Sequence, residues 1–526
     1  MISWEHDQIK PELAFGSGLN QYLVVWEDHH WASGDARDIY GRRMSTSGSG
    51  FGGAFGISYE GNERFAPDVA YNSVRQNYLV VFEYEYSLSD HDIYGRFVNS
   101  DGTLGSEFSI ATPTAYDMNP KVAYSPAQDS YLVVWERRVG DPEFGEMNIF
   151  AQVLDYDGTR LGSEIALDTG TARQEHPAIA YNSSGWDEYL VVWQDMQAGN
   201  WDIMGRRVDA DGDLLGGEIT IEASGHDQTW PDIAYNSRHT EYMVVWQDQI
   251  GGATSDWDIK SWRRDIGGNA INWYLVSSAG TQRRMKPTVT YKYEADEYLV
   301  VYEYEYSASD LDLKQSRLRW DGATRLTDAV VSNAYNIYEG RPAVASDDGW
   351  SNLIVWEDGR NAGTMGIDIY SDVEPVYGLE GSVYKGLPTD TSSPLAGVDV
   401  ALYCSTDPGV WGDYVEGTST DSAGAYTLVV QGSCPYYDIG EYTPEGYEST
   451  GAATTGGIVR TWDKIQYSSP LAGKTLTGNN FWDAPEAPLA PTGVSASDGT
   501  YTDRVLVTWS AAAGASYYEV HRATSS

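Results

Sequence analysis

Two series of oxygen-bearing side chains recur along the chain at nearly equal intervals. The first series consists of Glu27, Glu83, Glu136, Gln194, Gln247, Glu303 and Glu357. The second series consists of Asp38, Asp92, Asn148, Asp202, Asp258, Asp312 and Asp368. A single catalytic centre would break this regularity, so the pattern favours a structural role. In that interpretation the Asp residues accept backbone hydrogen bonds in the loop before a strand, and the Glu residues pair with Arg42 or Arg96.

Calcium binding is the alternative chemistry for the second series. Calcium prefers about six to eight oxygen ligands, which carboxylate-rich loops can supply. The residues assigned to calcium in this interpretation are Asp38, Asp92, Asp202, Asp258, Asp312 and Asp368. Two further segments, 155–158 and 209–213, look like calcium loops but lack the downstream glutamate that such loops need. Hairpin turns are the better prediction for both.

Aromatic residues form a second group with chemical potential. They lie in segments between the recurring runs, among many acidic residues, and the candidates are Trp31, Tyr84, Tyr86, Trp201, Trp230, Trp257, Tyr304 and Tyr306. Flat rings beside carboxylates can stack on sugar rings and hydrogen-bond their hydroxyls, so they predict a glycan-binding rim. Packing of the same rings between neighbouring repeats is the competing interpretation.

No catalytic motif accompanies these residues, and no catalytic residue is predicted. The chain has neither a His-Glu-x-x-His zinc motif nor a Gly-x-Ser-x-Gly nucleophile turn. A pair of acids for glycoside hydrolysis stays open, because among 77 Asp and Glu residues some pair will always be close.

The elements that must position these residues are seven copies of one segment. Its best-preserved part is the run Tyr-Leu-Val-Val-Trp-Glu-Asp at residues 22–28. The later copies begin at Tyr78, Tyr131, Tyr189, Tyr242, Tyr298 and Asn352, at spacings of 56, 53, 58, 53, 56 and 54 residues. Self-similarity at a fixed period indicates a repeat architecture.

Each repeat contains four strand-like pieces, and the apolar run is the second. Its uninterrupted apolar character indicates a strand covered on both faces. Four antiparallel strands repeated seven times predict a seven-bladed β-propeller over residues 1–374. The first strand of each repeat is expected to start at a proline, and these prolines are Pro11, Pro67, Pro120, Pro177, Pro231, Pro287 and Pro342. The seventh repeat stops after its third strand, so the N-terminus is expected to supply the closing strand.

The composition of the chain restricts its possible partners and cellular location. The 526 residues carry a formal charge of −43 and are rich in Tyr, Trp and Gly. Such an acidic surface disfavours nucleic acid and anionic membranes as partners. The sequence has no apolar run long enough to span a bilayer and no recognisable signal segment. Its two cysteines, Cys404 and Cys434, predict a disulfide.

The repeats resemble those of bacterial and archaeal surface propellers with Tyr-Leu-Val-Val-Trp-Glu-Asp repeats. That resemblance implies the fold and leaves the activity open.

Residues 375–484 resemble the prealbumin-like B-type domains of collagen adhesins and serine-aspartate-repeat surface proteins. The matching segments are 381–384, 395–403, 420–428, 444–447 and 479–483. This resemblance implies a β-sandwich spacer. It also suggests a Lys385–Asn480 cross-link beside Glu441, but Lys385 falls late in its strand and the disulfide is the favoured staple.

The last part of the chain, residues 485–526, begins with a Pro/Ala linker. Segments 493–496, 505–509 and 517–522 then resemble the first three strands of a fibronectin type III domain. The expected fold class is therefore all-β, with a seven-bladed propeller, a prealbumin-like or immunoglobulin-like sandwich and part of a fibronectin type III sandwich.

Three functions are compatible with these observations. The first is an exported, non-catalytic cell-surface or matrix protein whose propeller recognises a glycan or protein ligand. The second is a carbohydrate-active enzyme, a glycoside hydrolase or polysaccharide lyase, with accessory domains. The third is a filament or sheath subunit that binds copies of itself by exchanging strands.

Overall fold

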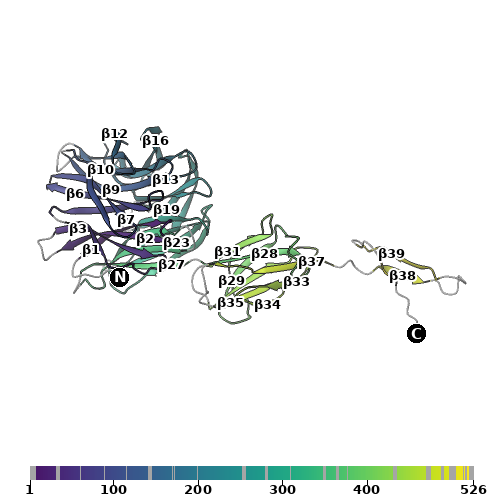
Figure 1. The fold of residues 1–526 in the computed structure, drawn as a ribbon. Helices are drawn as coiled ribbons and strands as arrows, with labels where there is room; N and C mark the ends of the chain where they lie inside the picture. The colour runs from purple at the N-terminus through teal and green to yellow at the C-terminus, as the bar shows by residue number, and fades with distance from the viewer. Residues whose placement is uncertain are drawn as a thin grey trace. The chain divides into compact units, whose positions relative to one another are not determined.

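The structure is a computed structural model. It describes residues 7–30, 36–59, 61–87, 89–113, 115–139, 145–168, 170, 172–197, 199–250, 256–278, 282–307, 310–347, 351–362, 366–375, 377–430, 435–468, 475–486, 491–496, 505–512, 515 and 518–520. The chain divides into two compact units, Met1–Val376 and Tyr377–Ser526, and both consist of β-strands (Figure 1). Within these described ranges, no helix has the length and apolarity needed to cross a membrane.

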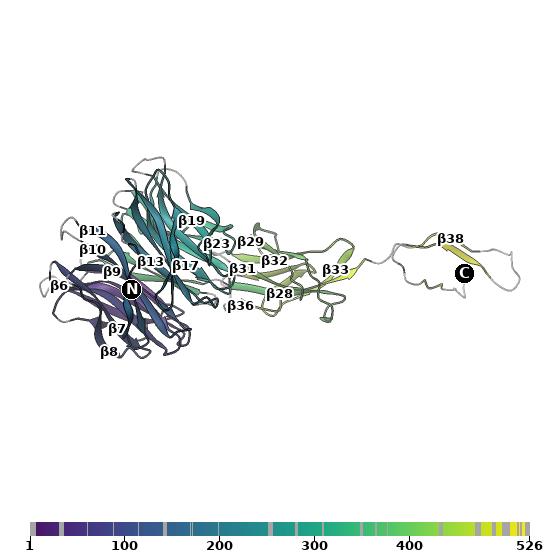
Figure 2. The same cartoon turned by 90° about the horizontal axis from the view of Figure 1, so that it is seen from above.

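Unit 1 is the predicted seven-bladed β-propeller (Figures 1 and 2). Its strands follow one another in antiparallel groups that each form one blade, and a single parallel pairing of His91 with Tyr116 joins blades 2 and 3. Blades 1 to 3 consist of β1 (Asp7–Gly16), β2 (Gln21–His30), β3 (Ala36–Ser45), β4 (Phe55–Ser58); β5 (Arg64–Asn72), β6 (Asn77–Ser87), β7 (Asp90–Asn99), β8 (Leu104–Ala111); and β9 (Tyr116–Ser125), β10 (Ser130–Val139), β11 (Glu146–Asp155), β12 (Arg160–Ala166). Blades 4 and 5 consist of β13 (Gln174–Asn182), β14 (Glu188–Gln197), β15 (Asn200–Asp209), β16 (Leu214–Glu222); and β17 (Gln228–Asn236), β18 (Glu241–Gln249), β19 (Trp257–Asp265), β20 (Ala270–Ser277). Blades 6 and 7 consist of β21 (Arg284–Lys292), β22 (Glu297–Ser307), β23 (Asp310–Arg319), β24 (Thr324–Ser332); and β25 (Glu339–Ser346), β26 (Ser351–Asp358), β27 (Asp368–Pro375).

The second strand of each blade is buried on both faces, as the apolar run predicts. In β2, the side chains of Leu23 and Val25 pack with Val80 of blade 2. The alternate side chains, Val24 and Trp26 among them, pack in a cluster with residues of blade 7. All of these β2 side chains are inaccessible to solvent. Because side chains alternate across a strand, one apolar run fills two inter-blade cores.

The prolines do not begin the first strands, which corrects the sequence prediction. In β1 the strand starts at Asp7, and Pro11 lies at a β-bulge where the register against β2 shifts between Ile9 and Glu12. The same shift occurs in blades 2, 4, 5, 6 and 7. A bulge leaves one residue outside the hydrogen-bond ladder, so the missing N–H of proline costs little there.

Blades 1 and 7 close the ring through direct contacts. The backbone N–H of Gln8 donates to the carbonyl of Ile367 at 2.7 Å, and the N–H of Ile367 donates to Asp7 Oδ1 at 2.8 Å. The predicted closing strand from the N-terminus falls on residues 1–6, which lie outside the described residues.

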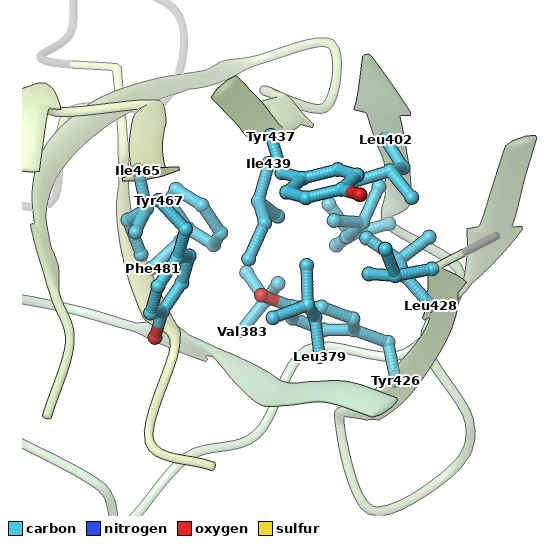
Figure 3. Close-up of a cluster of buried hydrophobic side chains, with 13 residues drawn as sticks. Leu379, Val383, Leu402, Tyr426, Leu428, Tyr437, Ile439, Ile465, Tyr467 and Phe481 are labelled. Carbon is cyan, nitrogen blue, oxygen red and sulfur yellow. The ribbon is translucent and has the colours of Figure 1, made fainter. Parts of the chain in front are cut away.

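Unit 2 contains a β-sandwich of two five-stranded sheets. One sheet contains β31 (Ala425–Val430), β28 (Tyr377–Lys385), β37 (Asn480–Pro485), β33 (Tyr447–Ala453) and β36 (Thr475–Leu476). The other contains β30 (Asp413–Ser419), β29 (Asp399–Ser405), β32 (Tyr436–Tyr442), β35 (Lys464–Ser468) and β34 (Ile458–Thr461). Figure 3 shows the core between them, where Leu379, Ile439 and Phe481 are fully buried. A separate two-stranded sheet, β38 (Thr492–Ala496) with β39 (Val507–Ser510), follows, and the fibronectin type III assignment stays a prediction.

Two covalent bonds were predicted in unit 2, the Cys404–Cys434 disulfide and the Lys385–Asn480 cross-link. Cys404 is disulfide-bonded, whereas Cys434 lies outside the described residues. Lys385 Nζ lies 5.8 Å from the centre of the Tyr447 ring, and Asn480 Oδ1 accepts the backbone N–H of Ser382 at 3.0 Å. Glu441 is buried close to Asp483, and the Lys385–Asn480 cross-link stays a prediction.

The buried acids of unit 2 predict that its stability falls as pH rises. Burial and the neighbouring Asp483 and Asp463 raise the pKa of Glu441 to about 8, and burial raises the pKa of Asp483 to about 6. Because the folded state holds these protons more tightly, the stability that these two acids contribute is greatest below about pH 4.5 and is lost as pH rises towards 8. We expect Glu441→Gln to remove most of this loss, about 3 kcal/mol, in urea unfolding of unit 2 at pH 4.5 and 8.5. Equal pH dependence in the variant and the parent protein would contradict this.

Candidate functional site

The first series of recurring side chains joins each blade to the next. In all seven copies a side-chain oxygen accepts the backbone N–H of the residue that precedes the proline of the following blade. The pairs are Glu27–Ala66, Glu83–Asn119, Glu136–His176, Gln194–Trp230, Gln247–Lys286, Glu303–Arg341 and Glu357–Lys10, at 2.8–3.4 Å. The expected structural role is therefore present with a different partner. Glu27 and Glu83 bind backbone in this way, while Arg96 donates to two carbonyls and Glu107 instead.

The seven residues before the prolines share one unusual backbone conformation. Lys10, Ala66, Asn119, His176, Trp230, Lys286 and Arg341 all have φ between 45° and 55°. Residues with side chains seldom adopt this left-handed region, and it is normally unfavourable before proline. The hydrogen bond from the neighbouring blade holds each residue in place. Together the seven residues and the prolines after them form part of the wall of a cavity of about 620 Å³, which the first strands of all seven blades enclose. We call this cavity the channel.

The side chains at the seven equivalent positions differ, and their distribution is asymmetric. Lys286, Arg341 and Lys10 come from the consecutive blades 6, 7 and 1 and form a basic arc. Each is held by a buried carboxylate of its own blade: Lys286 Nζ lies 3.0 Å from Glu303, Arg341 Nε lies 3.6 Å from Glu357, and Lys10 Nζ lies 3.2 Å from Glu27. The three cations remain 26–38% exposed, so each keeps donors that face the channel.

The opposite side of the channel carries an amide, an imidazole and an indole. These belong to Asn119, His176 and Trp230, from blades 3, 4 and 5. The rings of His176 and Trp230 stack with centres 4.0 Å apart, and Lys286 Nζ lies 5.4 Å from the Trp230 ring centre. Burial and the positive charges of Arg341, Lys121 and Lys286 lower the pKa of His176 to about 4. The imidazole is therefore neutral at pH 7.

A further layer of the channel wall is formed two positions after the left-handed residues in the chain. It consists of Glu12, Asp68, Lys121 and Asp232. Lys121 Nζ contacts Glu12 and lies 3.6 Å from Asp68. Asp68 Oδ2 accepts the Val122 N–H at 2.7 Å, and Asp232 Oδ2 accepts the Val289 N–H at 2.8 Å. These bonds join blades 2 and 3, and blades 5 and 6. Burial raises the pKa of Asp68 to about 7, against the opposing charge of Lys121, and raises that of Asp232 to about 6.

The aromatic residues predicted for the rim have separate environments. Trp230 lines the channel, whereas Tyr86 and Tyr306 are 67% and 64% exposed. Tyr84 packs against Tyr94 of its own blade, with ring centres 4.7 Å apart and the ring planes tilted by 32°. The remaining candidates are placed as follows: Trp257 is buried, the ring centre of Tyr304 lies 3.5 Å from Lys314 Nζ, the backbone N–H of Trp201 donates to Asp227, and Trp31 lies outside the described residues.

The six aspartates considered for calcium occupy six different blades, and the structure does not bring them together. Each lies on the third strand of its blade, directly opposite the second strand. Asp202 Oδ1 accepts Asn200 Nδ2 at 2.8 Å, and Asp368 Oδ2 accepts Asn361 Nδ2 at 2.7 Å. Asp38 Oδ1 lies 3.8 Å from Arg64. Burial and nearby acids raise the pKa values of Asp92 and Asp258 to about 6 and also raise that of Asp312.

Sequence reasoning did not identify Lys10, Asn119, His176, Lys286 and Arg341 as site residues. Their signal was present, because each precedes one of the seven recurring prolines. However, six different residue types occupy the seven equivalent positions. A shared role in lining the channel can be recognised only once the bulge that directs these residues towards it is known.

Comparison with known proteins assigns neither a family nor an activity to the chain. No family model matches the chain, and no curated protein matches it. A protein of unknown function from Dyadobacter fermentans is similar over 60% of this chain and 94% of its own, with 9% identity and a TM-score of 0.44. An endo-arabinase from Bacteroides thetaiotaomicron covers 49% of this chain and 95% of its own (14% identity, TM-score 0.32). A mutant α-L-arabinofuranosidase from Fusarium graminearum covers 56% of this chain and 89% of its own (13% identity, TM-score 0.39). All three TM-scores are below 0.5, so these structures carry no argument about the activity or the site of this chain.

Proposed function

We propose that the chain is an exported surface protein whose propeller recognises an anionic saccharide, such as a uronic acid unit, in the channel. The carrying observation is the basic arc of Lys286, Arg341 and Lys10 at equivalent positions of three consecutive blades. In a chain of net charge −43, three cations gathered around one cavity are a local exception. Asn119, His176 and Trp230 on the opposite side offer neutral hydrogen-bonding groups for sugar hydroxyls.

The partly exposed cations of the basic arc favour an anion rather than a cation as the ligand. The carboxylates Glu303, Glu357 and Glu27 orient the three cations, but the pKa of His176 is still lowered by burial and by positive charge across the channel. A carboxylate entering the channel could accept charge-assisted hydrogen bonds from the donors that these three cations leave exposed, and such bonds are strong in a partly dehydrated site. The channel is also large enough, because pockets of about 300–1,000 Å³ suit small ligands.

The test is calorimetric titration with oligosaccharides that contain or lack uronic acids. We expect Lys286→Gln combined with Arg341→Gln to weaken binding of the acidic oligosaccharide at least about 10-fold, since two charged hydrogen bonds are lost. Arg319→Gln is the matched control. Arg319 belongs to blade 6 like Lys286, is 44% exposed and lies at the opposite end of the blade, paired with Asp321. Equal binding of neutral and acidic oligosaccharides, or equal losses in the control, would refute the proposal.

Hydrolysis of a glycoside is a second candidate, supported by Asp68 and Asp232. Both line the channel, and burial raises both pKa values, so one acid can be protonated while the other is ionised. Release of reducing sugar from an acidic polysaccharide, abolished by Asp232→Asn with binding retained, would establish the enzyme. Binding without product release at any pH between 5 and 8 would leave the recognition function alone.

A further inference from the structure

We propose that blade 4 of the propeller binds a calcium ion through Asp168, Asp195 and Glu218. Among the residues that the structure describes, these three side chains form a cluster that could hold a metal ion. One carboxylate oxygen from each lies within 4.8 Å of the other two. Asp168 belongs to the link between β12 and β13, Asp195 to β14 and Glu218 to β16. The site contains none of the six aspartates considered above and is separate from the channel.

Asp195 is the observation that distinguishes this group from an ordinary acidic surface. Its side chain is fully buried, and neither carboxylate oxygen has a hydrogen-bond partner among the described residues. Burial and the neighbouring Asp168 raise its pKa, and the nearby Trp193, Gln174 and Gln197 side chains oppose this rise, yet none of the three makes a hydrogen bond of acceptable geometry with it. A buried carboxylate without a donor is costly, and two further carboxylates beside it add to that cost.

The repeats provide an internal comparison at this position. The residue equivalent to Asp195 is Asp248 in blade 5 and Asp358 in blade 7. Lys260 Nζ lies 2.7 Å from Asp248, and the guanidinium of Arg360 forms a salt bridge with Asp358. In blade 4 the position of Lys260 is occupied by Met204, which lies opposite Trp193 as Lys260 lies opposite Trp246. Blades 5 and 7 thus supply a cation from their own chain, whereas blade 4 brings two more anions to the same place.

The ligand set fits a hard cation with irregular coordination. Carboxylate oxygens favour calcium or magnesium over the softer transition metals. Opposed ligands around calcium lie about 4.6–5.2 Å apart, since each bond is about 2.3–2.6 Å, and calcium tolerates variable geometry. Magnesium requires a tighter and more regular octahedron. Asp168 is partly exposed and Glu218 is exposed, so the ion can reach Asp195 from solvent and keep water ligands on that side.

The three ligands also predict what the ion does. Asp168 is fixed at the start of blade 4: its Oδ1 accepts the Gly170 N–H at 2.9 Å, and Gln174 donates to its Oδ2. An ion held between Asp168, β14 and β16 would therefore tie the entry of the blade to its second and fourth strands. Calcium should stabilise the propeller through this tie.

The experiment measures metal binding and thermal unfolding of the full chain after removal of bound metal by a chelator. Terbium luminescence excited through tryptophan, with Trp193 two residues from Asp195, reports occupancy, and calcium should quench it by displacement. We expect Asp195→Asn and Glu218→Gln each to weaken calcium binding at least 10-fold. Asp211→Asn, an exposed acid in the turn between β15 and β16 of the same blade, is the matched control and should bind normally.

The sign of the stability change gives a second readout. Without metal, Asp195→Asn should unfold at the same or a higher temperature than the parent protein, because it removes an uncompensated buried charge. With millimolar calcium the parent should gain about 2 °C or more in Tm and the variant should not. Equal calcium affinity in the parent and Asp195→Asn would overturn the site, and so would a preference for magnesium over calcium.

Discussion

Replacing Trp246 by alanine should lower the free energy of unfolding of the propeller by about 3–5 kcal/mol, the usual cost of deleting a fully buried large aromatic side chain. Trp246 is inaccessible to solvent and packs in one cluster with Val192 and Ile203 of blade 4. Its loss therefore opens a cavity between two blades, each of which depends on its neighbour for burial.

The matched control for this variant is Trp273→Ala in the same blade. Trp273 lies on β20 and is 57% exposed, so its removal should change stability by less than about 1 kcal/mol. The measurement is the midpoint of urea unfolding followed by far-ultraviolet circular dichroism. Similar midpoints for the two variants would show that the inter-blade cores do not carry the stability of the ring.

Glu136 is the second position where a large effect is expected, and the sign depends on the replacement. Glu136→Ala removes the carboxylate oxygen that accepts the partly buried N–H of His176 at 2.8 Å, and it should cost about 1–3 kcal/mol. Glu136→Gln keeps an acceptor in place. Gln194 and Gln247 make the same bond in blades 4 and 5, at 3.0 and 2.8 Å.

The pH dependence of Glu136 separates these two variants. Burial and the nearby acids Glu175 and Glu83 raise the pKa of Glu136 to about 8. The folded state then holds the proton more tightly than the unfolded state, so stability decreases as pH rises from about 4.5 to 8. Glu136→Gln should be more stable than the parent at pH 8.5 and close to it at pH 4.5. A constant difference between the two proteins across this range would contradict the raised pKa.

Much of the fold could be predicted because one apolar run of five residues repeats. Tyr22 to Trp26 lack the alternation of a strand with one wet face, and the structure places alternate side chains in two cores. The bulge at Pro11 could not be predicted in the same way. It depends on an acceptor from another blade, Glu357, which is 347 residues away from Lys10.

The candidate site was predictable only in part for a related reason. Trp230 was named because tryptophan among acids suggests glycan binding, but Lys286 and Arg341 are ordinary residues in sequence. Only the closed ring brings Lys10 into the same arc as residues from blades 6 and 7. Likewise, Asp168, Asp195 and Glu218 are spread over 50 residues and match no metal-binding spacing.

The left-handed residues before the prolines bear on how this protein can change over evolutionary time. Six residue types, from alanine to tryptophan, occupy the seven equivalent places with nearly the same φ. The scaffold therefore accepts substitution there without a new backbone arrangement. During evolution, the side chains that face a ligand in the channel can therefore be replaced one at a time. Binding specificity can change in this way while the fold is retained.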